Sequence, residues 1–398
     1  MAAKPVYGVG VDAGSRATRV VITTLEQGRV RLRGSGQAPS QGWIKSRIAD
    51  SRAVADSIGA ALRQAEAEAG VSVEAAAVGM GGKGARGANA RGALELGYIR
   101  EIDQRDVNRV VNRAARVQLQ EDRMVLQLFP QDFVVDDHPG HRDPRKMMAT
   151  RLEINVHLVT ASVQEHNALV GAVNQAHLTV EETVFEGLAA AYATVLPDER
   201  RQGVAVVDIG AESTELVVYY GDAMQLASSV PICGDHFTRD LAQVLCLSYE
   251  DAELVKTEYG GALSEGCLEN VTVEVPMPQE RERHVQRKLL NQILEARSAE
   301  LFHMVRGELA RVGMEHALLG GVFLTGAAAR LPDLCDVAER VLQCPACFGL
   351  PVGILNWPET LRAPEWAGAA GLAMYSAKLK VQAGRERDSA GWLGRVLR

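Results

Sequence analysis

The sequence contains no hydrophobic run that approaches the ~20 residues needed to cross a bilayer, and no recognisable secretory signal. Its first residues, MAAKPVYGVG, carry one lysine and only short apolar stretches. We therefore expect neither a transmembrane helix nor a cleaved leader. The composition, 47% hydrophobic and 23% charged, is that of an ordinary globular protein, and 398 residues are enough for two domains.

A disulfide framework and an excess of positive charge are also missing. The six cysteines show no spacing typical of a disulfide framework, which fits a reducing cytoplasm. Cys344 and Cys347 form a single CxxC with no second ligand pair nearby, so we expect two small, partly buried thiols rather than a zinc site. The formal net charge of −7 argues against nucleic-acid binding, because such proteins need a basic face to displace counterions from phosphates.

What the sequence does contain is a pair of similar glycine turns, far apart in the chain. The first, GVDAGSRATRVVITTLEQG (10–28), has the pattern of a strand, a turn and a strand. The second, VAVVDIGAESTELVVYYGD (204–222), repeats that pattern. Two copies of an α/β unit, each opening with a hairpin, predict two lobes around a cleft.

Each turn places an aspartate at the end of a strand and small residues where the backbone bends. Asp12 precedes Gly14, and Asp208 precedes Gly210. Backbone N–H groups of such turns can surround a polyphosphate, while the carboxylates hold Mg²⁺ directly or through its waters. A third turn, LTGAA (324–328), follows a late strand. Because Asp-x-Gly is also common in plain hairpins, the prediction of a nucleotide site depends on the three turns together.

In these turns the sequence resembles the actin/Hsp70/sugar-kinase superfamily, and within it the FtsA family of bacterial cell-division proteins. The resemblance covers essentially the whole chain. Its most specific part contains FPQDFVVD (129–136) and LEINVHLVTA (152–161), which are similar to the subdomain inserted in FtsA. The other matching segments are SQGWIK (40–45), GDHFTRDLA (234–242), AELVK (252–256) and LEARSAEL (294–301).

The resemblance implies an α/β, two-lobed actin-like ATPase fold of duplicated ribonuclease-H-like units, with an inserted small α+β subdomain and a C-terminal amphipathic helix. The expected boundaries are 1–80 and 163–199 for the first-lobe core, 81–162 for the inserted subdomain, 200–350 for the second lobe with a helical subdomain at 241–318, 351–380 for a return to the first lobe, 381–390 for a linker and 391–398 for the amphipathic helix.

The resemblance also implies a site for ATP and Mg²⁺, with Asp12 and Asp208 holding the metal ion. Glu186 matches a glutamate that orients water in some bacterial actins, although an acid that favours the N-terminus of the following helix is an equal interpretation. The residues expected to bind the nucleotide are Asp12, Gly14, Ser15, Arg16, Asp208, Gly210, Ala211, Glu212, Gly234, Glu253, Lys256, Gly326 and Ala327.

Four residues in the turns depart from the family pattern, namely Ala17, Ala211, Glu212 and Ala327. The added Cβ atoms and the extra carboxylate would lie close to the phosphates. We therefore expect at most slow ATP hydrolysis.

The partners implied by the resemblance are the C-terminal peptide of FtsZ, further copies of the chain in filaments, membrane lipids and later divisome proteins. The FtsZ peptide is expected at Glu295, Arg297 and Glu300, in a helix of the second lobe. The implied location is the cytoplasmic side of the cell membrane, at the division site.

The last residues, SAGWLGRVLR (389–398), place apolar side chains at helical spacing beside basic ones. Basic groups near an anionic leaflet contribute about 1 kcal/mol each, so such a helix would bind a membrane weakly alone and well when many copies act together. The residues expected to bind the membrane are Trp392, Leu393, Arg395, Val396, Leu397 and Arg398.

Two other functions fit parts of the sequence. A sugar-kinase-like or acetate-kinase-like phosphotransferase would use the same turns, but it would need a catalytic aspartate in a substrate cleft. A PilM-like pilus assembly ATP-binding protein shares the fold and the inserted subdomain, and DIGAES (208–213) favours that alternative. Neither function needs an amphipathic C-terminus, so the tail favours the FtsA-like function.

Overall fold

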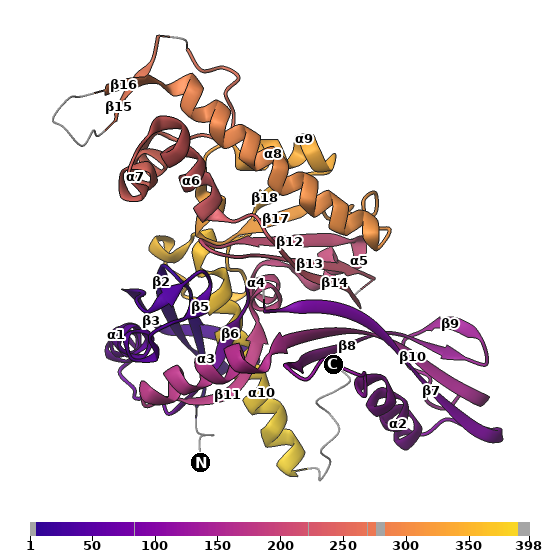
Figure 1. Cartoon of the computed structure of the whole chain (residues 1–398). Coiled ribbons are helices and arrows are strands. Elements are labelled where there is room, and N and C mark those ends of the chain that lie inside the picture. The colour runs from indigo at the N-terminus through magenta and orange to yellow at the C-terminus, as the bar shows by residue number, and fades with distance from the viewer. Residues whose placement is uncertain (1–4, 83, 222, 269, 276–282, 389–398) are drawn as a thin grey trace.

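The computed structural model of the chain has two lobes, with a smaller subdomain that extends from the first (Figure 1). It describes residues 5–82, 84–221, 223–268, 270–275 and 283–388. Each lobe is built on its own β-sheet, and the inserted subdomain has a separate sheet. Among the described residues, no helix is both long and apolar enough to span a membrane.

The first lobe contains a six-stranded sheet in the order β11-β6-β1-β2-β3-β19. The first three strands of the chain form an antiparallel meander, and β6 and β11 add in parallel beside β1. The strands are β1 (Val6–Ala13), β2 (Ala17–Glu26), β3 (Arg29–Pro39), β6 (Ala75–Met80), β11 (Thr179–Phe185) and β19 (Ile354–Leu355).

The second lobe repeats this topology in a five-stranded sheet, β14-β13-β12-β17-β18. Its first three strands are again an antiparallel meander, and the last two add in parallel beside the first. The strands are β12 (Val204–Ile209), β13 (Thr214–Tyr220), β14 (Ala223–Val230), β17 (Val322–Thr325) and β18 (Ala346–Phe348). The duplication predicted from the two glycine turns is therefore confirmed, strand by strand.

Local sequence signals explain where the first-lobe helices begin and end. The side chain of Asp50 accepts hydrogen bonds from the first turn of α1 (Ser51–Ala69), and Gly70 ends that helix in the left-handed conformation at φ 66°. The other helices that cover this lobe are α3 (Val163–Gln175), α4 (Glu186–Thr194), α5 (Pro197–Gln202) and α10 (Ala367–Asp388).

Helix α10 packs unusually close to its neighbours because small residues line the contact. A Cβ on Gly371 would overlap the carbonyl oxygen of Ala189 in α4, and a Cβ on Gly10 would overlap that of Ala369. The helix continues to Asp388, so residues 381–388, expected to form a linker, are helical. The segment contains no proline, and its one glycine, Gly384, is flanked by residues that form helices well, so nothing local ends the helix at residue 380.

The inserted subdomain is a four-stranded sheet, β7-β10-β8-β9, covered by one helix. Helix α2 (Gln104–Ala115) faces the sheet with its buried residues, among them Val107 and Val110. The strands are β7 (Arg86–Glu101), β8 (Arg123–Val135), β9 (His138–His141) and β10 (Met148–Ser162). Residues 86–92, which contain two glycines and no run of apolar side chains, are part of β7 because β10 pairs with them from Arg86 onward.

The outer part of the second lobe is mainly helical. A long helix crosses it and packs on the sheet through residues such as Leu301 and Phe302. The helices are α6 (Gly234–Leu245), α7 (Tyr249–Tyr259), α8 (Arg287–Arg311) and α9 (Leu334–Leu342), and the small hairpins are β15 (Thr272–Val275) with β16 (Arg283–Gln286) and, in the first lobe, β4 (Trp43–Ile44) with β5 (Arg47–Ile48).

Candidate functional site

A cavity of about 580 Å³ lies where the turns of the two lobes face each other. The β1–β2 turn contributes from the first lobe, and the β12–β13 turn, the turn after β17 and the N-terminal part of α6 contribute from the second. The volume is within the range of small-molecule and cofactor sites. The predicted residues that line it are Asp12, Gly14, Ser15, Arg16, Glu186, Asp208, Gly210, Ala211, Gly234, Glu253, Lys256, Gly326 and Ala327.

The turn after β17 requires a glycine for two reasons. Gly326 has a φ of 84°, a conformation that side chains with a Cβ rarely adopt. A Cβ there would also overlap the carbonyl oxygen of Ile209 and lie 2.5 Å from Oδ1 of Asp208. The third turn therefore packs directly against the second, and together they form one wall of the cavity.

Four carboxylates meet at the base of the cavity: Asp12, Asp208, Glu186 and Glu215. Burial raises the pKa of Asp12, Asp208 and Glu186, and for Asp208 and Glu186 the negative charge of Glu215 raises the pKa further. Burial also raises the pKa of Glu215 to about 7. The cluster therefore resists full ionisation at neutral pH and favours a compensating cation.

Glu215 was not predicted from the sequence, although the structure places it at the centre of this cluster. It is 1% exposed, and its Oε1 accepts a hydrogen bond of 2.6 Å from the N–H of Gly82. A Cβ on Gly81 would lie 2.7 Å from this oxygen and still closer to Oε2 of Glu186. The glycine at residue 81 thus allows the two carboxylates to approach each other.

The duplication contains a signal that could have revealed Glu215. In the first hairpin Asp12 pairs with Arg19, and in the second Asp208 pairs with Glu215 at the equivalent position. Both residues line the cavity. The pair of hairpins therefore carries opposite charges at equivalent positions, and an alignment of the two hairpins would have identified both residues as part of the site.

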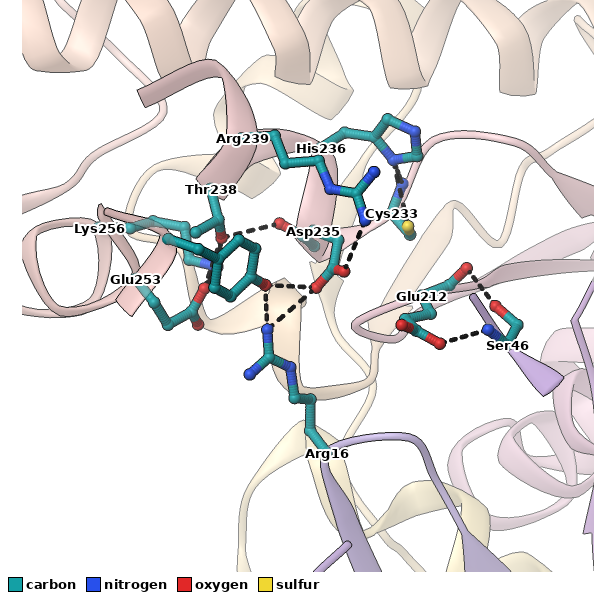
Figure 2. Close-up of polar contacts among 12 residues, drawn as sticks. Arg16, Ser46, Glu212, Cys233, Asp235, His236, Thr238, Arg239, Glu253 and Lys256 are labelled. Carbon is teal, nitrogen blue, oxygen red and sulfur yellow. Dashed lines mark hydrogen bonds and ion pairs between the residues drawn. The ribbon is translucent and has the colours of Figure 1, made fainter. Parts of the chain in front are cut away.

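Glu212 lies outside the main cavity, unlike the other residues expected to bind the nucleotide. It lines a second cavity of about 260 Å³ on the other side of the turns. Its carboxylate accepts a hydrogen bond from the N–H of Ser46, and its carbonyl oxygen accepts one of 2.9 Å from the Ser46 hydroxyl (Figure 2). This contact joins the β12–β13 turn to the first lobe and directs the extra carboxylate away from the main cavity.

Arg16 also joins the lobes, on the opposite side of the turns. Its guanidinium lies 3.3 Å from Oδ1 of Asp235 in α6, donates a hydrogen bond to the hydroxyl of Tyr249, and stacks 4.8 Å from the centre of that ring. The Tyr249 hydroxyl in turn donates a hydrogen bond of 2.6 Å to Oδ1 of Asp235. Arg16 therefore contacts the second lobe across the cavity.

The helices α6 and α7 supply the remaining polar groups of the cavity. The ammonium group of Lys256 donates hydrogen bonds of 2.8 Å both to Oε2 of Glu253 and to the hydroxyl of Thr238 (Figure 2). The Lys256 side chain is 13% exposed, so this network holds a positive and a negative group in fixed places at one end of the cavity. Such an arrangement offers both a donor and an acceptor to the hydroxyl groups of a ligand.

The residues expected to contact FtsZ lie together on α8, and each has an intramolecular partner. Arg297 forms two hydrogen bonds to Asp240, of 2.6 and 2.9 Å, and an ion pair with Glu300. Glu295 forms an ion pair of 2.8 Å with Arg340. The expected membrane-binding residues, within 391–398, lie outside the described residues.

Comparison with known proteins identifies the family. Residues 205–371 match the family described as cell division protein FtsA, and residues 82–160 match the SHS2 domain inserted in FtsA. The FtsA of Pseudomonas aeruginosa is 32% identical over 369 residues, which span 92% of this chain and 88% of that protein. The chain belongs to the FtsA family. The FtsA of Borreliella burgdorferi is 33% identical over 375 residues, which span 92% of this chain and 90% of that protein.

Solved structures that resemble this FtsA-family chain have the actin-like fold. The PilM–PilN type IV pilus biogenesis complex matches with a TM-score of 0.64 and 18% identity over 94% of this chain and 98% of that chain. MreB5 of Spiroplasma citri bound to ADP matches with a TM-score of 0.56 and 12% identity over 97% and 99%. The two-lobed actin-like fold and the FtsA-type insertion predicted from the sequence are confirmed.

Proposed function

We propose that this protein binds ATP with Mg²⁺ between its lobes, assembles into filaments, and attaches FtsZ filaments to the cytoplasmic face of the cell membrane at the division site. The C-terminal amphipathic segment would supply the membrane contact, and α8 with Glu295, Arg297 and Glu300 would receive the FtsZ C-terminal peptide. Later divisome proteins would be recruited to the same assembly. The observation that carries the proposal is the cavity that the duplicated turns form in a chain of the FtsA family.

The residues of the cavity fit a nucleoside triphosphate. Gly14, Gly210 and Gly326 leave backbone groups accessible in the three turns, and the structure leaves no room for a Cβ at Gly326. Lys256 and Glu253 suit the hydroxyl groups of a ribose. MreB5, which shares the fold, has been solved with ADP and with AMPPNP.

The residues at the base of the cavity fit a hydrated Mg²⁺ ion. Within the described chain, no three His, Cys, Asp or Glu side chains are arranged to hold a metal ion by themselves. Mg²⁺ retains several waters and usually takes one or two carboxylates together with phosphate oxygens, so Asp12 and Asp208 would be sufficient. The bound ion would supply the positive charge that the four carboxylates lack, and Glu186 would orient a water molecule towards the terminal phosphate.

Sedimentation with liposomes tests the proposal as a whole. We expect the full chain to pellet with anionic liposomes, more completely with ATP, and to bring a labelled FtsZ C-terminal peptide into the pellet. Trp392→Glu should abolish pelleting, and unchanged pelleting of this variant would show that the C-terminal segment is not the anchor. Asp12→Ala and Asp208→Ala should each weaken the binding of Mg-ATP. If both variants bind Mg-ATP with the affinity of the parent protein, the assignment of the turns to phosphate and metal binding is wrong.

The likeness to PilM supports a second candidate, an ATP-binding scaffold of pilus assembly. Its TM-score of 0.64 is accompanied by only 18% identity, whereas relatives named FtsA reach 32 and 33% over nine-tenths of the chain. The peptide arm of the liposome experiment separates the two functions, because only the FtsA-like function requires capture of the FtsZ peptide.

A further inference from the structure

The outer surface of α2 carries a row of arginines, which we call the α2 arginine stripe. At 100° per residue these positions fall within an arc of about 80° on one side of the helix. The opposite side packs on the inserted sheet through Val107, Val110 and Val111. Its members, all exposed, are Arg105, Arg109 and Arg113 in α2 and Arg116, the residue that follows the helix. The guanidinium group of Arg113 donates a hydrogen bond of 2.6 Å to the carbonyl oxygen of Ala93 in β7, so Arg105, Arg109 and Arg116 are the members that lie free of the sheet.

The charge of the stripe is scarcely neutralised within the chain. Asp106 lies 3.8 Å from Arg109, but both of its carboxylate oxygens already accept hydrogen bonds from Arg100, at 2.6 and 2.7 Å. Across the described residues, no ion pair involves Arg105, Arg113 or Arg116. The inserted subdomain, 81–162, has thirteen basic and eleven acidic residues, although the whole chain has a net charge of −7.

Helix α2 lies on the same side of the molecule as the end of α10. In Figure 1, α2 lies below the inserted sheet, and α10 runs downward, away from the second lobe. Helix α10 therefore ends at Asp388 on the side of the molecule where α2 lies (Figure 1). A flat surface held by residues 389–398 would meet α2 as well.

We propose that the α2 arginine stripe binds the headgroups of anionic lipids, as a second membrane contact beside the C-terminal segment. The inference rests on the proposed attachment of the protein to a membrane. Guanidinium groups donate paired hydrogen bonds to phosphate oxygens, and each basic residue that reaches an anionic leaflet raises binding about fivefold. The convex, unpartnered helix surface suits a planar layer of headgroups.

A second contact also fixes the orientation of the protein. A single anchor at the C-terminus leaves the body free to rotate about α10. Contact through α2 removes this freedom and holds the inserted subdomain against the bilayer, with the second lobe directed away from it (Figure 1).

The proposal is tested in the full chain with R105Q/R109Q/R116Q. Glutamine is a good helix former, and none of the three side chains makes a hydrogen bond that the helix depends on, so α2 should stay folded. The control is R287Q/R306Q/R311Q, which removes the same charge from exposed positions on α8 in the second lobe. Melting temperatures verify that both variants are folded.

Binding is measured by sedimentation with phosphatidylcholine vesicles, with and without phosphatidylserine. The stripe variant should bind phosphatidylserine vesicles at least about tenfold more weakly than the parent protein, should match it on neutral vesicles, and should be restored by R105K/R109K/R116K. The control variant should match the parent protein on both. Equal binding of the stripe variant and the parent to phosphatidylserine vesicles would overturn the proposal.

Two further arms separate this inference from the proposed function. If Trp392→Glu binds phosphatidylserine vesicles as well as the parent protein, the proposed C-terminal anchor is wrong. The effect of the stripe is still given by the comparison of the stripe variant with the parent protein. Sedimentation velocity without lipid tests the alternative that the stripe binds an acidic protein surface. If the stripe variant loses self-association and keeps its affinity for phosphatidylserine vesicles, the stripe contacts another copy of the chain and the lipid assignment is wrong.

Discussion

Replacement of Glu215 by glutamine tests the electrostatics of the cavity most directly. The carboxyl group is 1% exposed, and burial raises its pKa from 4.5 to about 7. Glu215→Gln keeps an oxygen that accepts the hydrogen bond from Gly82 and removes the group that can ionise. In the absence of nucleotide and metal, we expect the variant to be more stable than the parent protein above pH 7 and nearly equal to it near pH 5.

The size of the effect follows from the pKa. Because the pKa is higher in the folded state than in the unfolded state, the folded protein binds more protons between pH 4.5 and about 7. The free energy of unfolding of the parent therefore falls as the pH rises through this window. The difference between the two pKa values, at 1.36 kcal/mol for each unit, amounts to about 3 kcal/mol. The glutamine variant does not lose this contribution.

Urea unfolding of both proteins across this pH range measures the difference. Glu359→Gln is the control, because this side chain is 84% exposed and its replacement should have little effect at any pH. Addition of Mg²⁺ and ATP should raise the stability of the parent above pH 7 more than that of the variant, since the cation stabilises the ionised carboxylates. A difference between parent and variant that does not change with pH would refute the reasoning.

Two other predictions concern packing and the contact between the lobes. Gly371→Ala should lower the free energy of unfolding by about 3 kcal/mol or more, because its Cβ would overlap the carbonyl oxygen of Ala189, whereas Gly307→Ala in α8, where a Cβ meets nothing, should raise it by up to ~1 kcal/mol in the same urea titration. Tyr249→Phe removes the hydroxyl group between Arg16 and Asp235, so a fluorescent ATP analogue should dissociate faster in a stopped-flow chase. An unchanged rate would mean that this contact does not hold the lobes together.

The features that the sequence predicted well are those with local signals. Asp50 and Gly70 mark both ends of α1, and the two Asp-x-Gly turns lie where their flanking strand patterns place them. Each turn brings its aspartate to the cavity because the carboxyl ends of β1 and β12 face each other across the lobes. The duplication made this arrangement predictable, since one hairpin served as a guide to the other.

The features that were missed depend on contacts between distant parts of the chain. Glu215 enters the carboxylate cluster because Gly81 and Gly82, more than a hundred residues earlier, leave room and donate a hydrogen bond. Glu212 is directed into the second cavity by Ser46, which belongs to the other lobe. The first residues of β7 look like a loop in isolation and become a strand only because β10 pairs with them.

The continuity of α10 has a consequence for assembly on a surface. The helix begins beside the main cavity, where Gly368 faces Asp12, and it is packed on the first lobe as far as Lys380, whose ammonium group donates a hydrogen bond of 2.8 Å to the carbonyl oxygen of Tyr7. The eight helical residues from Val381 to Asp388 extend about 12 Å further at 1.5 Å per residue, so in the proposed attachment this short, stiff segment would limit the height and tilt of each copy above the bilayer. Molecules that are already aligned lose less rotational entropy when they meet, so the membrane would act as a template on which filaments form at concentrations too low for assembly in solution.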